Sequence, residues 1–163
     1  MTRAKISLLL IKKEVDMPGE MKGAQDRIVI RFRDGRLLKG YTSDFTPLKD
    51  TFHLTSAQGN DKGTSYNVAT EDLKAVFFVK TFEGNKAYVE KKRFDEVDTT
   101  YLQGRRVKLE FFDGEIMRGV SPGYSRGRKG FFIIPVDPKS NNEKIYVISN
   151  ALRQVELGSA AEK

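Results

Sequence analysis

The sequence contains one phrase twice, and this repeat constrains the fold more than any other feature. Residues 28–40 read IVIRFRDGRLLKG and residues 107–119 read VKLEFFDGEIMRG. In both, apolar residues alternate up to a Phe, and Asp-Gly, two apolar residues, a cation and a Gly follow. Matching positions such as Asp34 and Asp113 lie 79 residues apart, and this offset holds without a gap from 27/106 to 78/157. The chain is therefore an internal duplication, and each copy is one structural unit.

Each copy reads as five short strands. Ile28, Ile30 and Phe32 alternate with polar residues, which is typical of a half-buried antiparallel strand. Asp-Gly between two such runs predicts a hairpin with a type I′ turn, and Gly40 or Gly119 inside the second strand indicates a sharp bend. The remaining runs are TFHLTS, SYNVAT and LKAVFFV in the first copy and GFFIIPV, KIYVIS and LRQVEL in the second. We therefore predict an all-β chain of two internally duplicated, five-stranded antiparallel small barrels.

The organisation of the chain follows from these repeats. The 163 residues suit one ordinary domain or two very small ones. We expect an N-terminal arm (1–26), a first barrel repeat (27–82), a charged linker (83–104), a second barrel repeat (105–157) and a short tail (158–163).

The phrase with a Phe, Asp-Gly and a later Gly, together with SYNVATEDLKAVF, resembles the Sm-like family, which includes the bacterial Hfq RNA chaperones. The resemblance covers about two thirds of the chain, taken as two copies, and implies Sm-like or SH3-like barrels and RNA as a ligand. The family's usual Asp and Asn after the second strand are not matched: the loops read SDFTPLKDT and SPGYSRGRKG, with only Asp44 nearby. The whole pattern, with LKAVFFVKTFEGN and PVDPKSNNEKIYV, is also similar to an uncharacterised bacterial family of tandem barrels.

Composition excludes several functional classes. The sequence has no Cys and a single His, His53, so it lacks disulfides, thiol nucleophiles and Cys-based or multi-His metal sites. No acid–base pair or nucleophile stands out, and we predict no enzymatic activity, no catalytic residue, no cofactor and no metal. The longest apolar run, residues 6–11, is far shorter than the about 20 residues of a membrane span, and we expect a cytoplasmic protein without such a span.

The charge of the chain bears on its partners. The net charge is +7 and the pI is about 9.5, which suits RNA or another polyanion, an acidic membrane surface or an acidic protein as a partner, and equally a basic protein whose charge serves only solubility. The sharpest basic segment is PGYSRGRKG, with Tyr124, Arg126, Arg128 and Lys129. Guanidinium groups bind phosphate through paired donors, and a Tyr ring can stack on a base. The alternative is a solvated hairpin loop in which glycines make the turns.

A second candidate surface is the first predicted strand. Arg27, Arg31 and Arg33 share one parity, opposite to the apolar residues, so they project from one face and could follow a nucleic-acid backbone. The alternative is the solvent-facing side of a half-buried sheet.

Adjacent Phe pairs, Phe77–Phe78 and Phe131–Phe132, form the third candidate. Neighbouring strand residues point to opposite faces, so one Phe of each pair should contact either the other copy or another subunit of a homo-oligomer. Two functions follow from these features. The first is a non-catalytic module of tandem barrels that binds RNA or another nucleic acid, and the second is a protein-interaction or regulatory module without a nucleic-acid ligand.

Overall fold

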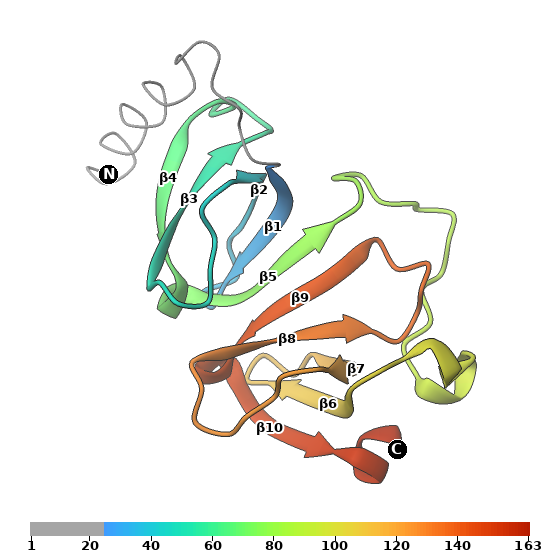
Figure 1. The fold of residues 1–163 in the computed structure, drawn as a ribbon. Helices are drawn as coiled ribbons and strands as arrows, with labels where there is room; N and C mark the ends of the chain where they lie inside the picture. The colour runs from blue at the N-terminus through green and yellow to red at the C-terminus, as the bar shows by residue number, and fades with distance from the viewer. Residues whose placement is uncertain (1–24) are drawn as a thin grey trace.

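The computed structural model describes residues 25–163, and its strands repeat with the spacing of the sequence (Figure 1). All but the last two residues of the predicted N-terminal arm lie outside this range. The described part is all-β, as predicted, and its only helical segments are short 3₁₀ turns. The first copy contains β1 (Asp26–Phe32), β2 (Leu37–Thr42), β3 (Thr51–Ser56), β4 (Ser65–Ala69) and β5 (Leu73–Val79). The second contains β6 (Arg105–Phe111), β7 (Ile116–Ser121), β8 (Gly130–Pro135), β9 (Asn142–Ile148) and β10 (Leu152–Leu157).

The 3₁₀ turns also follow the duplication. In each copy one turn joins the fourth strand to the fifth: η1 (Thr70–Asp72) and η4 (Ser149–Ala151). Two more, η2 (Phe94–Glu96) and η3 (Thr99–Tyr101), lie in the linker, and η5 (Gly158–Glu162) follows β10.

The ten strands form one open antiparallel sheet with the order β10-β6-β7-β8-β9-β5-β1-β2-β3-β4. Each copy contributes five adjacent strands, and the two sets join where β5 pairs with β9, from Ala75↔Val147 to Val79↔Asn142. The sequence predicts two separate barrels, whereas within residues 25–163 no strand pairing closes either copy on itself. The reason is that the edge of β9 pairs with β5 of the other copy instead of with β10 of its own.

Both Asp-Gly hairpins form, but their turns are wider than the predicted type I′ turn. Phe32 N donates to Arg36 O at 2.9 Å, Gly35 N donates to Phe32 O at 3.1 Å, and Gly35 has φ +96°. A type I′ turn requires positive φ at two residues, and in the described chain only glycines have it. Asp34 instead accepts a hydrogen bond from Arg36 N at 3.0 Å, so its carboxylate closes the turn.

Gly40 and Gly119 allow two strands to approach each other closely. A Cβ at Gly40 would collide with Thr55 O of β3, and a Cβ at Gly119 would collide with Ile134 O of β8. The second and third strands pair over only two positions in each copy, as at Gly40↔Ser56 and Gly119↔Pro135. The sequence predicts a sharp bend at these glycines, and what the structure shows at both is the close passage of the neighbouring strand, which leaves no room for a Cβ.

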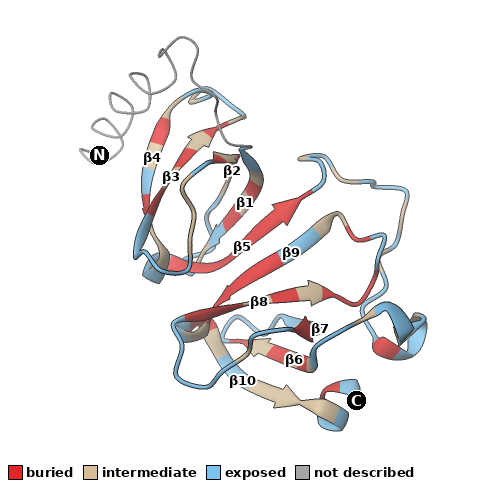
Figure 2. Cartoon of the chain, in the orientation of Figure 1, coloured by how far each residue is buried: buried red, intermediate tan, exposed pale blue. Residues whose placement is uncertain are grey.

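The core depends on β5, which is buried at every residue (Figure 2). Its side chains alternate between two apolar clusters. The cluster of the first copy receives Leu73, Val76 and Phe78. The cluster of the second copy receives Ala75, Phe77 and Val79. In return, β9 of the second copy places Tyr146 and Ile148 in the cluster of the first. Each core is therefore completed by a strand of the other copy.

Within the described residues the sheet has two free edges, β4 and β10, and both lack this apolar pattern. The position of Phe77 is taken by Glu156 in β10, and the position of Tyr146 is taken by Asn67 in β4. Glu156 pairs with Lys108 at 3.8 Å on the outer face of β10. Polar and charged side chains protect sheet edges against pairing with other chains. The junction between the copies is therefore not reproduced at either end of the sheet.

We expect Gly40→Val and Gly119→Val each to lower the free energy of unfolding by about 1–3 kcal/mol, the usual cost of forcing extra atoms into a packed site. Gly123→Val is the matched control, because a Cβ there meets no atom within 4 Å, and it should change stability by less than about 0.5 kcal/mol. Urea melts measure all three variants. Equal effects at the three positions would contradict the steric role of Gly40 and Gly119.

We also expect the chain to remain a monomer of 18.5 kDa in solution, because its two free edges carry polar side chains where the internal junction is apolar. Light scattering coupled to size exclusion measures the mass. A Gln154→Ala/Glu156→Phe variant, which restores the apolar residues of β5 at the free edge, should associate. A wild-type mass of several chains would show that the polar edges do pair.

Candidate functional site

The loop between β7 and β8, residues 122–129, carries the basic segment singled out in the sequence. Arg126 and Arg128 are exposed, and among the described residues neither forms an ion pair. The end of the loop is anchored to η4, since Ser149 Oγ donates to Arg128 O at 2.7 Å. Lys129 Nζ lies 2.9 Å from Asp50, at the matching position of the first copy's loop. The structure therefore brings the three cations together on an anchored loop, with one of them already paired.

Tyr124 is oriented differently from the sequence expectation of a base-stacking ring. Its ring packs edge-on against Phe131, with centroids 4.8 Å apart and an interplanar angle of 84°. It thereby covers the core of the second copy. Phe45 is its counterpart in the first copy and packs on Phe52 in the same way, at 5.0 Å. Tyr124 is thus a packing residue that belongs to the repeated pattern.

A pocket of about 440 Å³ lies beside this loop, where the two copies meet. We call it the junction pocket. Its first wall comes from the β2–β3 loop, β4 and η1 of the first copy, including Lys49, Asp50, Asn67 and Glu71. Its second wall comes from Lys129, Tyr146, Ile148 and Asn150 of the second copy. The amides of Asn67 and Asn150 can each donate and accept hydrogen bonds, which suits a ligand with both donors and acceptors.

The charges around the junction pocket are mixed, with a local excess of cations near Tyr146. Burial raises the pKa of the Tyr146 phenol, and the nearby positive charges of Arg128 and Lys129 oppose this shift. The hydrogen bond with Asp50 raises the pKa of Lys129, so this ammonium stays charged. Asp50 and Glu71 offset part of the positive charge. The pocket therefore combines hydrogen-bonding groups with the cationic end of the β7–β8 loop.

The predicted basic strand face is only partly occupied by internal contacts. Arg27 lies over the Phe82 ring at 5.7 Å and donates to Lys80 O, so it holds the segment that follows β5. Arg31 lies over Phe77 at 5.9 Å. Arg33 follows the end of β1 and is exposed. The three arginines therefore do not form one free stripe for a phosphate backbone.

The Phe pairs lie at the junction between the copies. Phe77 and Phe131 are buried in the cluster of the second copy, and Phe78 is buried in the cluster of the first. Phe132 belongs to the second copy yet packs against the cluster of the first, 5.9 Å from Phe78. Lys144 Nζ covers this pair at 4.8 Å and 4.9 Å from the two rings. The surplus aromatic surface is thus used within the chain.

Lys74 is a residue that sequence reasoning missed. Its ammonium is almost fully buried and donates to Asp113, at 2.6 Å, and to Glu115. These hydrogen bonds join β5 of the first copy to the Asp-Gly hairpin of the second. Its Nζ also lies 4.6 Å from the Phe111 ring. The hydrogen bond from Lys74 is the main cause that lowers the pKa of Asp113. A lone Lys within LKAVFFV gives no sequence signal that it reaches a carboxylate 39 residues away.

The comparisons with known proteins identify the family but no activity. A family model described as a family of unknown function, DUF6982, matches residues 24–159. The chain belongs to this family. No curated protein and no solved structure matches it significantly. In residues 25–163 no helix has the length and apolar character needed to cross a lipid bilayer.

The Lys74→Met substitution should make the free energy of unfolding depend less on pH in the acid range. The folded-state pKa of Asp113 lies below its ordinary value of 3.8, so ionised Asp113 contributes stability that is complete above the unfolded-state pKa and is lost as the pH falls through the folded-state pKa. Without Lys74 the main cause of this contribution is lost, while the hydrogen bond from Glu115 N remains. The free energy of unfolding should therefore fall less steeply between pH 7 and pH 2. Lys62→Met is the control, because Lys62 is exposed and, among the described residues, forms no ion pair. Parallel pH profiles for both variants would contradict the role of Lys74.

Proposed function

We propose that the chain is a non-catalytic binding module, built as two Sm-like barrels in tandem, whose ligand is single-stranded RNA. The observation that carries the proposal is the junction pocket, which is lined by Asn67, Asn150 and Lys129, the last residue of the β7–β8 loop. The Sm-like interpretation is supported by the strand order of each copy, with the fifth strand next to the first. It is also supported by the tight turn between the fourth and fifth strands, η1 or η4.

In this proposal the phosphates and the base are bound by different groups. Arg126 and Arg128 are exposed and free of carboxylates in the described chain, so their guanidinium groups can contact phosphate oxygens through paired donors. An unstacked base enters the junction pocket, where Asn67 and Asn150 hydrogen-bond to its edge. A duplex buries these edges in stacked pairs, which is why the ligand is single-stranded.

The experiment compares two triple variants of equal charge. In the first, Arg126, Arg128 and Lys129 of the loop are replaced by Gln. In the control, Lys62, Lys86 and Lys139, which are exposed elsewhere, are replaced by Gln. Filter binding with single-stranded random RNA at two salt concentrations should show weaker binding for the loop variant, with a salt slope lower by roughly one unit per lost phosphate contact. The control should retain the wild-type slope.

Two alanine substitutions test the pocket separately. Asn67→Ala/Asn150→Ala should weaken RNA binding by about 1–3 kcal/mol, the scale of base contacts, while leaving the salt slope unchanged. No binding of wild-type protein at low salt would overturn the proposal and favour the protein-interaction or regulatory module. Equal loss in the loop variant and its control would show only non-specific attraction between a basic protein and a polyanion.

A further inference from the structure

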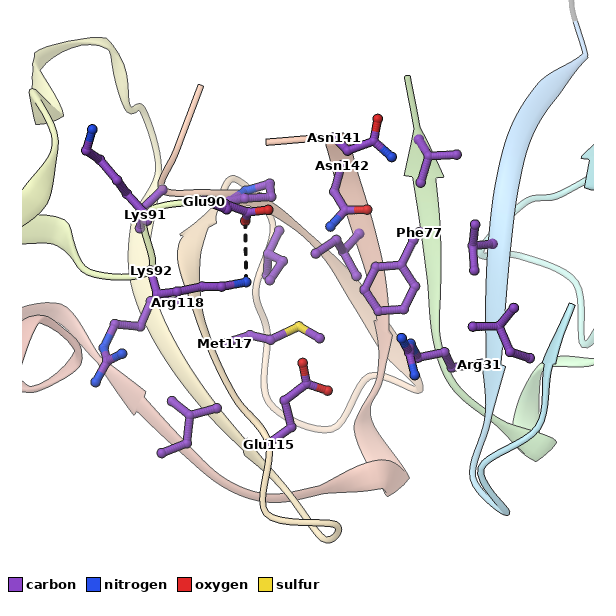
Figure 3. A pocket seen from close by; sticks show the side chains of 18 of the residues that line it. Arg31, Phe77, Glu90, Lys91, Lys92, Glu115, Met117, Arg118, Asn141 and Asn142 are labelled. Atoms are coloured by element: carbon purple, nitrogen blue, oxygen red, sulfur yellow. Dashed lines mark ion pairs between the residues drawn. The ribbon is translucent and has the colours of Figure 1, made fainter. Parts of the chain in front are cut away.

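A second cavity, of about 350 Å³, lies between the copies on the other face of the sheet (Figure 3). Ile145 of β9 lines it, whereas Tyr146 and Ile148 of β9 line the junction pocket. Neighbouring strand residues point to opposite faces, so the two cavities are separate. We call this cavity the inter-copy groove. Its walls are the outer face of β1 and β2, the side of β5 that carries Phe77 and Val79, the linker, and β7 to β9 of the second copy.

The linker wall of the groove is fixed by a buried carboxylate. Asp137 is 3% exposed and accepts hydrogen bonds from Lys91 N at 2.7 Å, Tyr88 Oη at 2.5 Å and Lys139 N at 2.9 Å. Burial by itself would raise the pKa of Asp137, but these hydrogen bonds lower it overall, so the carboxylate stays ionised. The segment from Glu90 to Lys92 is therefore held in place beside the groove, which is formed before any ligand arrives.

The lining combines apolar side chains with cations. Phe77, Val79, Met117 and Ile133 contribute apolar surface. Figure 3 shows Phe77 and Arg31 reaching into the space that Met117 and Asn142 face from the second copy. A cavity of this size falls within the range of about 300–1,000 Å³ that small-molecule sites occupy, and such sites join an apolar body with a few polar groups.

The charge of the groove is positive and incompletely paired. Five cations line it (Arg31, Lys39, Lys91, Lys92 and Arg118) against two carboxylates (Glu90 and Glu115). Both carboxylates already have partners: Glu90 pairs with Lys92 at 3.7 Å, and Glu115 accepts from Lys74. Within the described residues Arg31, Lys91 and Arg118 form no ion pair, and the enclosed Nε of Arg118 has no hydrogen-bond partner. The groove therefore keeps cations that no carboxylate of the described chain pairs with.

The matching face of the second copy shows that this excess is not a property of the repeat. Arg31 corresponds to Glu110, and Phe77 corresponds to Glu156. There Glu110 pairs with Arg153 at 3.6 Å and Glu156 pairs with Lys108 at 3.8 Å. The second copy therefore balances its charges at positions where the first copy keeps a free cation beside an aromatic ring.

We propose that the inter-copy groove binds a small organic anion with an apolar body, its carboxylate or sulfonate held by Arg31 and its body against Phe77 and Met117. The planar guanidinium matches a carboxylate with two donors, and the apolar wall excludes water from that contact. This site goes beyond the proposed RNA binding, because it lies on the other face of β9 and uses none of the same residues.

Methionine methyl resonances provide a direct test on the full chain. Of the four methionines, Met117 lines the groove, and the other three, Met1, Met17 and Met21, lie outside the described residues. In protein labelled with ¹³C at the methionine methyls, sodium octanoate should shift the Met117 signal saturably. Octylammonium chloride has the same chain with a cationic head, and should not shift Met117 at equal concentration. An equal response to both probes, or no saturable shift, would overturn the proposal.

Arg31→Gln and its matched control Arg33→Gln complete the test. Both arginines are exposed and lie two residues apart, but Arg33 does not line the groove. Loss of a charged hydrogen bond should raise the dissociation constant of octanoate about tenfold in Arg31→Gln and leave it unchanged in Arg33→Gln. The ligand-free Met117 signal reports whether each variant keeps the groove intact. Unchanged affinity in an intact Arg31→Gln protein would rule the site out, whatever the result of the RNA experiments.

Discussion

The pairing of β5 with β9 is the contact on which the rest of the structure depends. It converts two five-stranded sets into one sheet and gives β5 two apolar neighbourhoods, one on each face. Phe78 packs with its own copy and Phe77 packs with the other, so burial of this single strand stabilises both cores. The buried Lys74 adds directional hydrogen bonds to the second copy's hairpin, which fix how the sets are aligned. Both cavities between the copies follow from this alignment.

Duplication placed two equal surfaces in one chain, and divergence then gave them different chemistry. Phe77 and Tyr146, which meet at the internal junction, correspond to Glu156 and Asn67 at the free edges. Asp50 and Lys129 occupy one equivalent position in the two copies and have opposite charges, so they attract each other. Phe45 and Tyr124 instead kept the same packing role. Backbone geometry was thus conserved between the copies, while their surfaces were specialised.

Much of this architecture could be predicted from the sequence because it depends on local patterns. Alternation around Asp34 and Asp113 indicated the hairpins, and the constant offset of 79 residues indicated equal copies. The partner of β5 could not be predicted in this way. LKAVFFV shows that both faces of the strand are covered, but it does not specify by which strand. The same limit applies to Tyr124, since an aromatic residue in a Gly-rich loop has one sequence pattern whether its ring faces a core or a ligand. Lys74 and Asp137 form hydrogen bonds with residues that are distant in sequence, and no periodic pattern in the sequence marks either residue.

The sharing of β5 between the two cores also affects folding during synthesis on the ribosome. The first copy leaves the ribosome with β5 complete. Phe77 and Val79 stay exposed, however, until β9 is synthesised about 60 residues later. At roughly 5–20 residues per second, this apolar strand edge stays open for several seconds. An unpaired edge with apolar side chains is a template for association with other nascent chains. During synthesis there is therefore an interval in which β5, the most buried strand of the folded protein, is an exposed apolar edge that can aggregate. The length of this interval depends on the rate at which the residues between β5 and β9 are translated.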